Sequence, residues 1–458
     1  MAEKMSFRDK AENFADKLKA KRDGCIDVLK NGNARVACSM LVMGIGQLTY
    51  KQWTKGILYI LLQAAFIVYL VLAGAADFFG LFTLGSVAAN PWYGIEGDHS
   101  VIMMLRGILS IIVFVLYITL YISNIKGVYA TQKAVAEGRK PTTFFQDVKE
   151  LFDSKFYRTV LLIPIIGVCV FNVLPIVFMI LIAFTNYGGK VIPPTSLVDW
   201  VGFDNFGKLI VLGEYTTTFF KILGWNVLWA VASTAINYLG GLGLAILLNK
   251  KCVKGKAFWR LFPILAYAIP GFITMLGFKY MFANGGPINY YITEMGGSAI
   301  FFFGANSTWT ARIIGLMVNA WISIPASMLL ATGILSNANQ DQYEAAKIDG
   351  ANALQQFWYL TLPFVVFATT PVLLSQFIGN FNNFGIFYFL RSDIATSSGY
   401  ILANDTDLLI NWLYKMSIDN NYYNVGAAIS LIIFIITSGI SLIVYVFSPS
   451  YKQEETYK

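Results

Sequence analysis

The amino-acid sequence predicts an all-α, polytopic membrane protein with about eight transmembrane helices. Three observations lead to this fold class: 56% of the 458 residues are hydrophobic, only 13% are charged, and long apolar stretches recur along the chain. A soluble domain of ordinary composition carries roughly 25% charged residues. We therefore expect most of the chain to lie within a lipid bilayer.

Eight stretches are long and apolar enough to cross a bilayer, which takes roughly 20 residues of helix. We place them at 57–77, 101–124, 159–184, 220–248, 258–283, 309–335, 364–390 and 425–447. A ninth apolar run, residues 36–50, is short and contains two glycines and a glutamine. A full crossing there would put the basic N-terminal tail outside the cell, so the run is predicted to be re-entrant or interfacial.

The distribution of lysine and arginine predicts the orientation of the chain. Most basic residues lie in the segments 1–56, 125–158, 249–257, 336–363 and 448–458. The alternate loops, 78–100, 185–219, 284–308 and 391–424, hold only Lys190, Lys208, Arg391 and Lys415. By the positive-inside rule both termini are cytoplasmic and the number of crossings is even. The net charge of +8 is then explained by topology, and a nucleic-acid partner is not needed to account for it.

Catalytic and metal-binding patterns are not found in the sequence. The four cysteines are scattered without metal-ligand spacing and are expected to be reduced, and the single histidine, His99, is expected to be a solvated loop residue. No phosphate-binding GxxxxGK[ST] loop occurs, so we expect no cofactor in this chain and a separate chain to hydrolyse any ATP that transport uses. Charged residues fall near the ends of the predicted spans, which disfavours an ion-coupled carrier.

Neutral polar groups within the seventh predicted span are a candidate substrate site. At 3.6 residues per turn, Gln376, Asn380 and Asn383 share one face of a helix, with Gly379 beside them. Amides both donate and accept hydrogen bonds without charge, which suits sugar hydroxyls, and the neighbouring phenylalanines offer apolar surface. The alternative is that each amide joins neighbouring helices, as amides in membrane helices commonly do.

A polar helical segment, EAAKIDGANALQQFWYLTLP at residues 344–363, lies between the sixth and seventh predicted spans. Gln340 to Asp349 are good helix formers, Gly350 permits a tight bend, and Asn352 can cap a second short helix. Pro363 marks the start of the next span. The sequence thus predicts a compact helix-bend-helix in the cytoplasm, although an amphipathic connector lying on the membrane has a similar pattern.

This segment resembles the EAA signature of binding-protein-dependent ABC importer permeases. The matching residues are Glu344, Ala345, Ala346, Asp349, Gly350, Ala351, Phe357, Leu362 and Pro363. The stretches NFNNFGIFYFL at 380–390, LVDWVGFDNF at 197–206, FTNY at 184–187 and NGGP at 284–287 are similar to the larger, MalF-like subunit of maltose/maltodextrin permeases. The resemblance runs from about residue 155 to the C-terminus and implies the ABC importer type I permease fold.

The resemblance implies a division of the chain and roles for particular residues. Residues 1–56 would be a cytoplasmic tail with the short apolar run, 57–158 two accessory transmembrane helices and a cytoplasmic loop, 159–448 the permease core with a coupling segment at 340–363, and 449–458 a second cytoplasmic tail. The coupling segment, which in the family docks on the ATPase, would act through Glu344, Ala345, Ala346, Asp349, Gly350, Ala351, Phe357 and Pro363. Substrate would meet Gln376, Gly379, Asn380, Asn383, Ser323 and Ala326.

The resemblance also implies a cellular location, partners and a substrate. The chain would lie in the bacterial plasma membrane with a second, MalG-like permease subunit, two copies of a cytoplasmic ABC ATPase that bind ATP, and an extracellular solute-binding protein. Its cargo would be an α-glucan oligosaccharide. Two departures from the best-known maltose permeases, Gly379 and Ala326 in place of aromatic residues, widen the expected pocket. A short 185–219 loop in place of a large outer domain implies a Gram-positive type of system.

The resemblance leaves an ABC permease for a different sugar as an alternative, and two other functions remain from the residues alone. A stand-alone secondary carrier or channel for a neutral solute would need no partner chain. A membrane enzyme acting on lipid or glycan would need a nucleophile and a base, for which Asp98 beside His99 is the one candidate.

Overall fold

The computed structural model describes residue 19, residues 27, 28, 30–211, 215–250, 252–391, 393, 394 and 396–447, with the side chains of Arg158 and Phe447 left out. Within these residues the regular elements are helices, accompanied by three isolated β-bridges and no strand. The predicted cytoplasmic tail at 449–458 and most of the first 30 residues lie outside the described part. The chain divides after Val201 into two compact units, which we describe separately.

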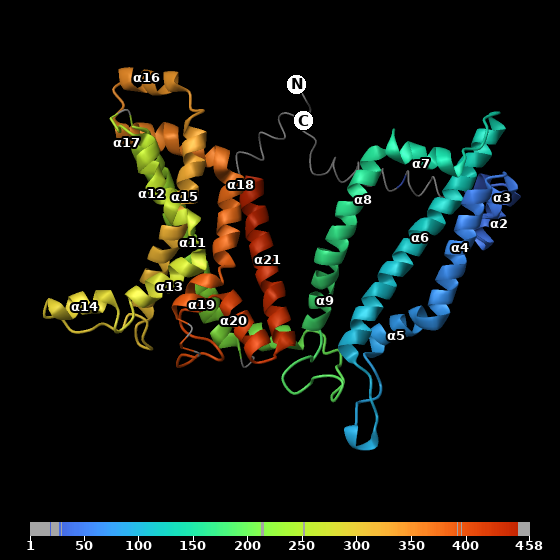
Figure 1. Ribbon diagram of the computed structural model, residues 1–458, viewed down its shortest axis with the longest axis horizontal. Helices are drawn as coiled ribbons and strands as arrows, with labels where there is room; N and C mark the ends of the chain where they lie inside the picture. The colour runs from blue at the N-terminus through green and yellow to red at the C-terminus, as the bar shows by residue number, and fades with distance from the viewer. Residues whose placement is uncertain are drawn as a thin grey trace. The chain divides into compact units, whose positions relative to one another are not determined.

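The first unit contains three helices that are long and apolar enough to span a membrane. Its elements are α2 Ala34–Leu41, α3 Ile45–Thr49, α4 Trp53–Tyr69, α5 Ala75–Thr83, α6 Ser100–Ala136, α7 Phe144–Phe152, α8 Phe156–Val168 and α9 Leu174–Ala183 (Figure 1). Short π-helical turns join α4 to α5 and α8 to α9, so the candidate spans are Trp53–Thr83, Ser100–Ala136 and Thr159–Ala183. They contain or nearly coincide with the first three predicted spans.

The short apolar run at 36–50 folds as α2 and α3, separated by a tight turn at Gly44. The Gly44 φ angle is +92°, and a Cβ atom there would lie 2.2 Å from the carbonyl oxygen of Gly56, so only glycine fits. Asn124 of α6 accepts hydrogen bonds from the Gly44 amide at 3.2 Å and from Gln47 Nε2 at 2.7 Å. Gln47 and the turn at Gly44 are therefore held against α6, while the placement of the run in the membrane stays a prediction.

The second unit contains the remaining spans. Its elements are α10 Asp204–Ile210, α11 Thr216–Asn249, α12 Lys256–Ala268, α13 Gly271–Met281, α14 Pro287–Glu294, α15 Thr308–Leu335, α16 Gln340–Ile348, α17 Ala353–Gln356, α18 Leu362–Phe381, α19 Gly385–Leu390, α20 Leu409–Tyr414 and α21 Tyr423–Phe447. Four candidate spans, Thr216–Asn249, Thr308–Leu335, Ala353–Leu390 and Tyr423–Val446, bring the number among the described residues to seven, or eight if the bent pair α12 and α13 counts as one. The predicted fold class is confirmed.

The fifth predicted span, 258–283, is not a straight helix. It consists of α12 and α13, which meet at an angle of 90°. Pro270 has no amide hydrogen, and it disfavours the helical conformation of the residue before it; Ile269 accordingly has an extended ψ of 130°. Pro270 is visible in the sequence, but the prediction of this span considered only the length of the apolar stretch.

The seventh predicted span is interrupted between α18 and α19. A break in a membrane helix leaves backbone carbonyls without partners, which is costly unless other groups bind them. Here Trp229 Nε1 of α11 donates to the carbonyl of Asn380 at 3.1 Å, and Asn226 Nδ2 donates to that of Phe381 at 3.1 Å. Asn411 Nδ2 donates to the carbonyl of Phe384 at 2.8 Å. The break is therefore a stabilised feature of the core.

Candidate functional site

Two of the predicted substrate residues bind neighbouring helices of the second unit. Gln376 Nε2 donates to Ser327 Oγ of α15 at 3.0 Å. Asn380 is buried, and its Nδ2 donates to Thr234 Oγ1 of α11 at 3.0 Å while its Oδ1 accepts from Asn319 of α15. These bonds give both amides a role in joining helices, which was the alternative interpretation of the pattern. Their contact with a substrate stays a prediction.

The expectation that Asn383 continues this helical face is wrong. Helix α18 ends at Phe381, and Asn383 lies in the break before α19. Its Oδ1 accepts a hydrogen bond from the Ile386 amide at 3.2 Å, so it caps the following helix. Gly379 is exposed, with open space where a Cβ would point.

The two predicted residues of α15, Ser323 and Ala326, are half-buried. Of the six predicted substrate residues, Gln376 and Asn380 bond to neighbouring helices, and contact of any of the six with a substrate stays a prediction.

A different face of the same span opens into a cavity of about 490 Å³. Its walls come from the end of α18, from α20 and from α21. The lining residues are Ile378, Asn382, Ile410, Leu413, Ser430, Ile433, Phe434, Thr437, Ser438 and Ser441. No ionisable side chain is among them. We call this cavity the neutral pocket.

The neutral pocket combines hydrogen-bonding groups with an aromatic surface. Asn382 and Ser430 offer amide and hydroxyl groups, and the Phe434 ring is 63% exposed beside them. Such a surface can bind a neutral solute that has both hydroxyl groups and apolar faces. The sequence analysis did not predict this surface because it considered polar residues of the seventh span only. Serine and threonine also recur at helical spacing in the eighth predicted span, at positions 430, 437, 438 and 441. Ile378, the lining residue that lies within α18, is about 200° around the helix from Asn380.

The segment at 340–363 forms the expected bend. Asn339 caps α16, Gly350 has a φ of +83°, and Asn352 caps α17 in a reciprocal pair with Gln355. The second helix is not a separate element, however, because a π-helical turn at Phe357–Thr361 continues it into α18. The span therefore begins at Ala353 rather than at Pro363.

Most predicted coupling residues are accessible. Glu344, Ala345, Asp349, Gly350 and Pro363 are exposed, and Ala346, Ala351 and Phe357 are half-buried. Figure 1 shows α16 at one end of the second unit, beyond α15 and α17. Ile348, between Lys347 and Asp349, is 87% exposed.

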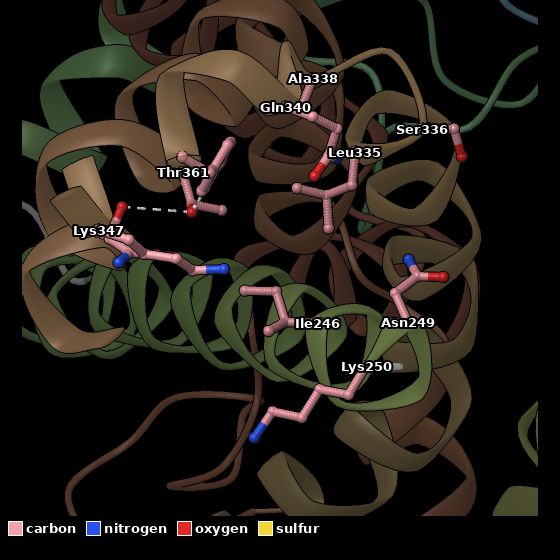
Figure 2. Close-up of a pocket in the computed structure, with 11 residues that line it drawn as sticks. Ile246, Asn249, Lys250, Leu335, Ser336, Ala338, Gln340, Lys347 and Thr361 are labelled. Carbon is pink, nitrogen blue, oxygen red and sulfur yellow. Dashed lines mark hydrogen bonds between the residues drawn. The ribbon is translucent and has the colours of Figure 1, made fainter. Parts of the chain in front are cut away.

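A cavity of about 400 Å³ lies between this segment and the end of α11 (Figure 2). Ile246 and Asn249 of α11 and Lys250 directly after it line the cavity, opposite Lys347 and Thr361. The hydroxyl groups of Tyr343 and Thr361 are 3.1 Å apart and form a hydrogen bond across the bend. The two arms of the segment are thus joined to each other above the end of α11.

The loops at the other end of the unit are held by Arg391, which is 1% exposed. Its guanidinium forms a salt bridge with Asp405 and donates to the carbonyl of Gly304 at 2.8 Å and to Thr406 Oγ1 at 3.2 Å. This side chain joins the loop before α15 to the loop after α19.

Asp98 and His99, the one candidate for a catalytic pair, do not form one among the described residues. The Asp98 carboxylate accepts hydrogen bonds from the backbone amides of Ser86 at 2.7 Å and Val87 at 3.0 Å. These bonds lower the pKa of Asp98. The carboxylate therefore holds a loop.

The fold is similar to that of solved ABC importer permeases. It superposes with a TM-score of 0.54 on a chain from the crystal structure of a bacterial ABC transporter involved in the import of the acidic polysaccharide alginate, covering 66% of this chain and 97% of that one at 19% identity. The helical architecture thus defines a membrane-spanning protein with the fold of ABC importer permeases.

Sequence comparison gives the family. Residues 238–453 match the model of the binding-protein-dependent transport system inner membrane component. The chain is 34% identical to the maltodextrin transport system permease protein MdxF of Bacillus subtilis, covering 91% of this chain and 95% of that protein. It is 32% identical to the galactooligosaccharides transport system permease protein GanP of the same organism and to the maltodextrin transport system permease protein MalC of Streptococcus pneumoniae, with 97% of each protein covered. The chain belongs to this family of ABC importer permease subunits.

Proposed function

We propose that this chain is one of two permease subunits of an ATP-driven importer for α-glucan oligosaccharides, and that the sugar passes the neutral pocket. The observation that carries the proposal is the pocket: an uncharged, mainly apolar cavity whose wall also carries the Asn382 amide and serine hydroxyl groups beside an exposed phenylalanine ring, in a chain of this family. Sugar hydroxyls hydrogen-bond to such groups, and the apolar face of a pyranose ring packs on an aromatic side chain. A cavity with no ionisable group is a poor site for a charged solute.

The choice of an α-glucan rather than another neutral oligosaccharide rests on the relatives. MdxF and MalC are named for maltodextrin, whereas GanP, with similar identity, is named for galactooligosaccharides. Galactooligosaccharides are therefore the competing substrate class. Family membership counts against a stand-alone carrier or channel.

The partners in this proposal are a second permease subunit, two copies of a cytoplasmic ATPase and an extracellular solute-binding protein. A chain taken from the alginate transporter bound to its periplasmic protein has the same fold, with a TM-score of 0.54. In this proposal the ATPase binds the bend around Gly350. When the two ATPase subunits close on ATP, the two permease subunits move as rigid bodies between inward-open and outward-open states. Both termini and the bend face the cytoplasm of a bacterial cell.

Uptake by the reconstituted complex tests the function. The chain is co-expressed with a second permease subunit, an ATPase and a solute-binding protein from the same genome, and ATP-dependent uptake of labelled maltotriose into proteoliposomes is measured. We expect unlabelled maltose to maltoheptaose to compete and galactooligosaccharides not to compete. The reverse order would overturn the substrate class. Uptake by the purified chain alone, without ATPase or ATP, would overturn the importer mechanism.

A further inference from the structure

The first unit contains a second polar cavity, of about 430 Å³, which the transport path of the second unit does not use. Its walls come from α3, α4, α6 and the segment that leads through α7 to Lys155. Lys55, Lys140 and Lys155 bring three ammonium groups to it, and Tyr59, Gln52 and Thr142 add neutral polar groups. We call it the lysine pocket.

The lysine pocket lies where candidate membrane spans end. Lys55 and Tyr59 belong to the first two turns of α4, and the apolar run of this span follows them. On the other wall, Gly127, Ala130 and Ala134 belong to the last turns of α6. The pocket therefore lies at the depth where the hydrocarbon of a bilayer gives way to headgroups.

Helix α7, beside the pocket, has the pattern of a helix that lies in the membrane interface. Phe145 and Phe152, seven residues apart and on one face, are 76% and 67% exposed. Asp147 on another face lines the lysine pocket and pairs with Lys55. A short amphipathic helix of this kind buries its aromatic face at the boundary between headgroups and acyl chains. The mouth of the pocket is then open to lipid.

The three lysines of the pocket differ in how many partners each ammonium group has. Lys55 is held by Asp147 and by the Thr142 carbonyl, to which it donates at 2.8 Å, so it is part of the wall. Lys155 pairs with Glu150, which lies outside the lining. Lys140 is exposed and forms no ion pair with any residue in the described part of the chain. An anion that enters meets Lys140 and the Lys155 ammonium above a floor of small residues.

We propose that the lysine pocket binds the phosphate of an anionic phospholipid, with Lys140 and Lys155 as its charged contacts and the acyl chains leaving along α4. Basic pockets between membrane helices at the interface are suited to such headgroups. A free phosphate has the same headgroup chemistry without the chains. The depth of the pocket and the aromatic face of α7 favour the lipid.

Lipid retention tests the proposal. The full-length chain is purified in a mild detergent with equal amounts of phosphatidylglycerol and phosphatidylcholine that have the same acyl chains, and bound lipids are counted by native mass spectrometry. We expect wild type to retain phosphatidylglycerol preferentially. The ratio of retained phosphatidylglycerol to phosphatidylcholine should fall about fivefold for each of Lys140→Gln and Lys155→Gln. The electrostatic attraction of one lysine to an anionic headgroup changes the binding constant by about this factor. Equal retention of the two lipids by wild type would overturn the proposal.

Three controls make the result specific. Lys149→Gln removes the same charge from an exposed position of α7 outside the pocket and should leave the preference unchanged; an equal loss there would overturn the proposal in favour of general surface attraction. The double variant Lys140→Arg/Lys155→Arg should keep the preference, because arginine retains the positive charge at both positions. Displacement of phosphatidylglycerol by millimolar inorganic phosphate would overturn the lipid assignment and indicate a free-anion site.

Discussion

The hydroxyl groups of Tyr343 and Thr361 lie 3.1 Å apart and join the two arms of the bent segment. The bond closes a loop between two membrane spans. Helix α16 follows the span formed by α15, and the π-helical turn at Phe357–Thr361 leads into the span that contains α18. A segment that transmits force between an ATPase and a membrane helix must be stiff, because a flexible loop would absorb the movement. We expect this one bond to contribute to that stiffness.

Tyr343→Phe should weaken coupling without unfolding the chain. The loss of one hydrogen bond costs about 1 kcal/mol, and the Thr361 hydroxyl keeps its bond to the Gln356 carbonyl. Membrane insertion should be unchanged, while sugar-stimulated ATP hydrolysis by the reconstituted complex should fall severalfold. Tyr359→Phe, at an exposed position of the same segment, is the matched control and should behave as wild type. Wild-type coupling in Tyr343→Phe would show that the bond is dispensable.

Substitutions at Gly350 should reduce coupling in the order of the backbone strain that each introduces. The φ of +83° costs a residue with a side chain about 1–2 kcal/mol, and nothing lies within 4 Å of a Cβ at this position, so Gly350→Ala should reduce coupling moderately. Gly350→Pro should abolish it, because proline cannot adopt this φ and the Gly350 amide bonds to the Lys347 carbonyl at 3.1 Å. Sugar-stimulated ATPase activity is the measurement. Gly333→Ala, in open space within α15, should be silent. Equal effects of Ala and Pro at 350 would contradict the strain argument.

Glu344→Ala tests the surface of the segment without changing its backbone. Glu344 is exposed, so the fold and the membrane insertion of the chain should not change. If this surface docks on the ATPase, co-purification of the ATPase with the permease should fall about tenfold. Asp341→Ala, one turn earlier and also exposed, is the control for a general loss of charge. Undiminished co-purification of Glu344→Ala would place the docking contact elsewhere.

Removal of the Arg391 side chain should destabilise the loops that it joins. Arg391→Met leaves the Asp405 carboxylate without its salt bridge and the Gly304 carbonyl without its donor. Breaking a buried pair in this way costs about 3–5 kcal/mol. The apparent Tm of the purified chain should therefore fall. Lys279→Met removes a pair with Asp393, which is largely exposed, and should change stability by about 1 kcal/mol or less. Similar Tm values for the two variants would contradict the assigned role of Arg391.

Hydropathy predicted the approximate limits of seven membrane helices because the bilayer imposes a minimum length on every apolar crossing. It did not predict the right-angle bend at Pro270 or the break after Phe381. Apolar length is insensitive to such interruptions when other groups bind the freed carbonyls. Trp229 and Asn226, which do so here, are some 150 residues away from the break in the sequence. A pattern within one segment cannot identify partners at that distance.

The candidate site was predicted less completely than the fold. The amides at 376 and 380 were correctly assigned to one helical face, but the sequence could not say what that face meets, and in the structure it meets Ser327 and Thr234. The pocket lies on the opposite side of the helix and needs α21 to complete it. A cavity is a relation between elements, so it becomes visible only when they are packed together.

Substitutions in the neutral pocket should separate substrate contact from helix joining. Asn382→Ala and Ser430→Ala each remove a hydrogen-bonding group from the cavity wall, and the loss of one bond to a sugar costs about 1 kcal/mol, so the KM of uptake should rise about fivefold. Phe434→Ala removes the exposed ring and should raise the KM of uptake at least as much. Gln376→Leu instead breaks the bond to Ser327, so it should lower the apparent Tm and leave KM nearly unchanged. The measurement is maltotriose uptake at a series of concentrations, paired with thermal unfolding of each variant. The opposite result, a raised KM for Gln376→Leu and wild-type values for the pocket variants, would return the substrate path to the inner amide face.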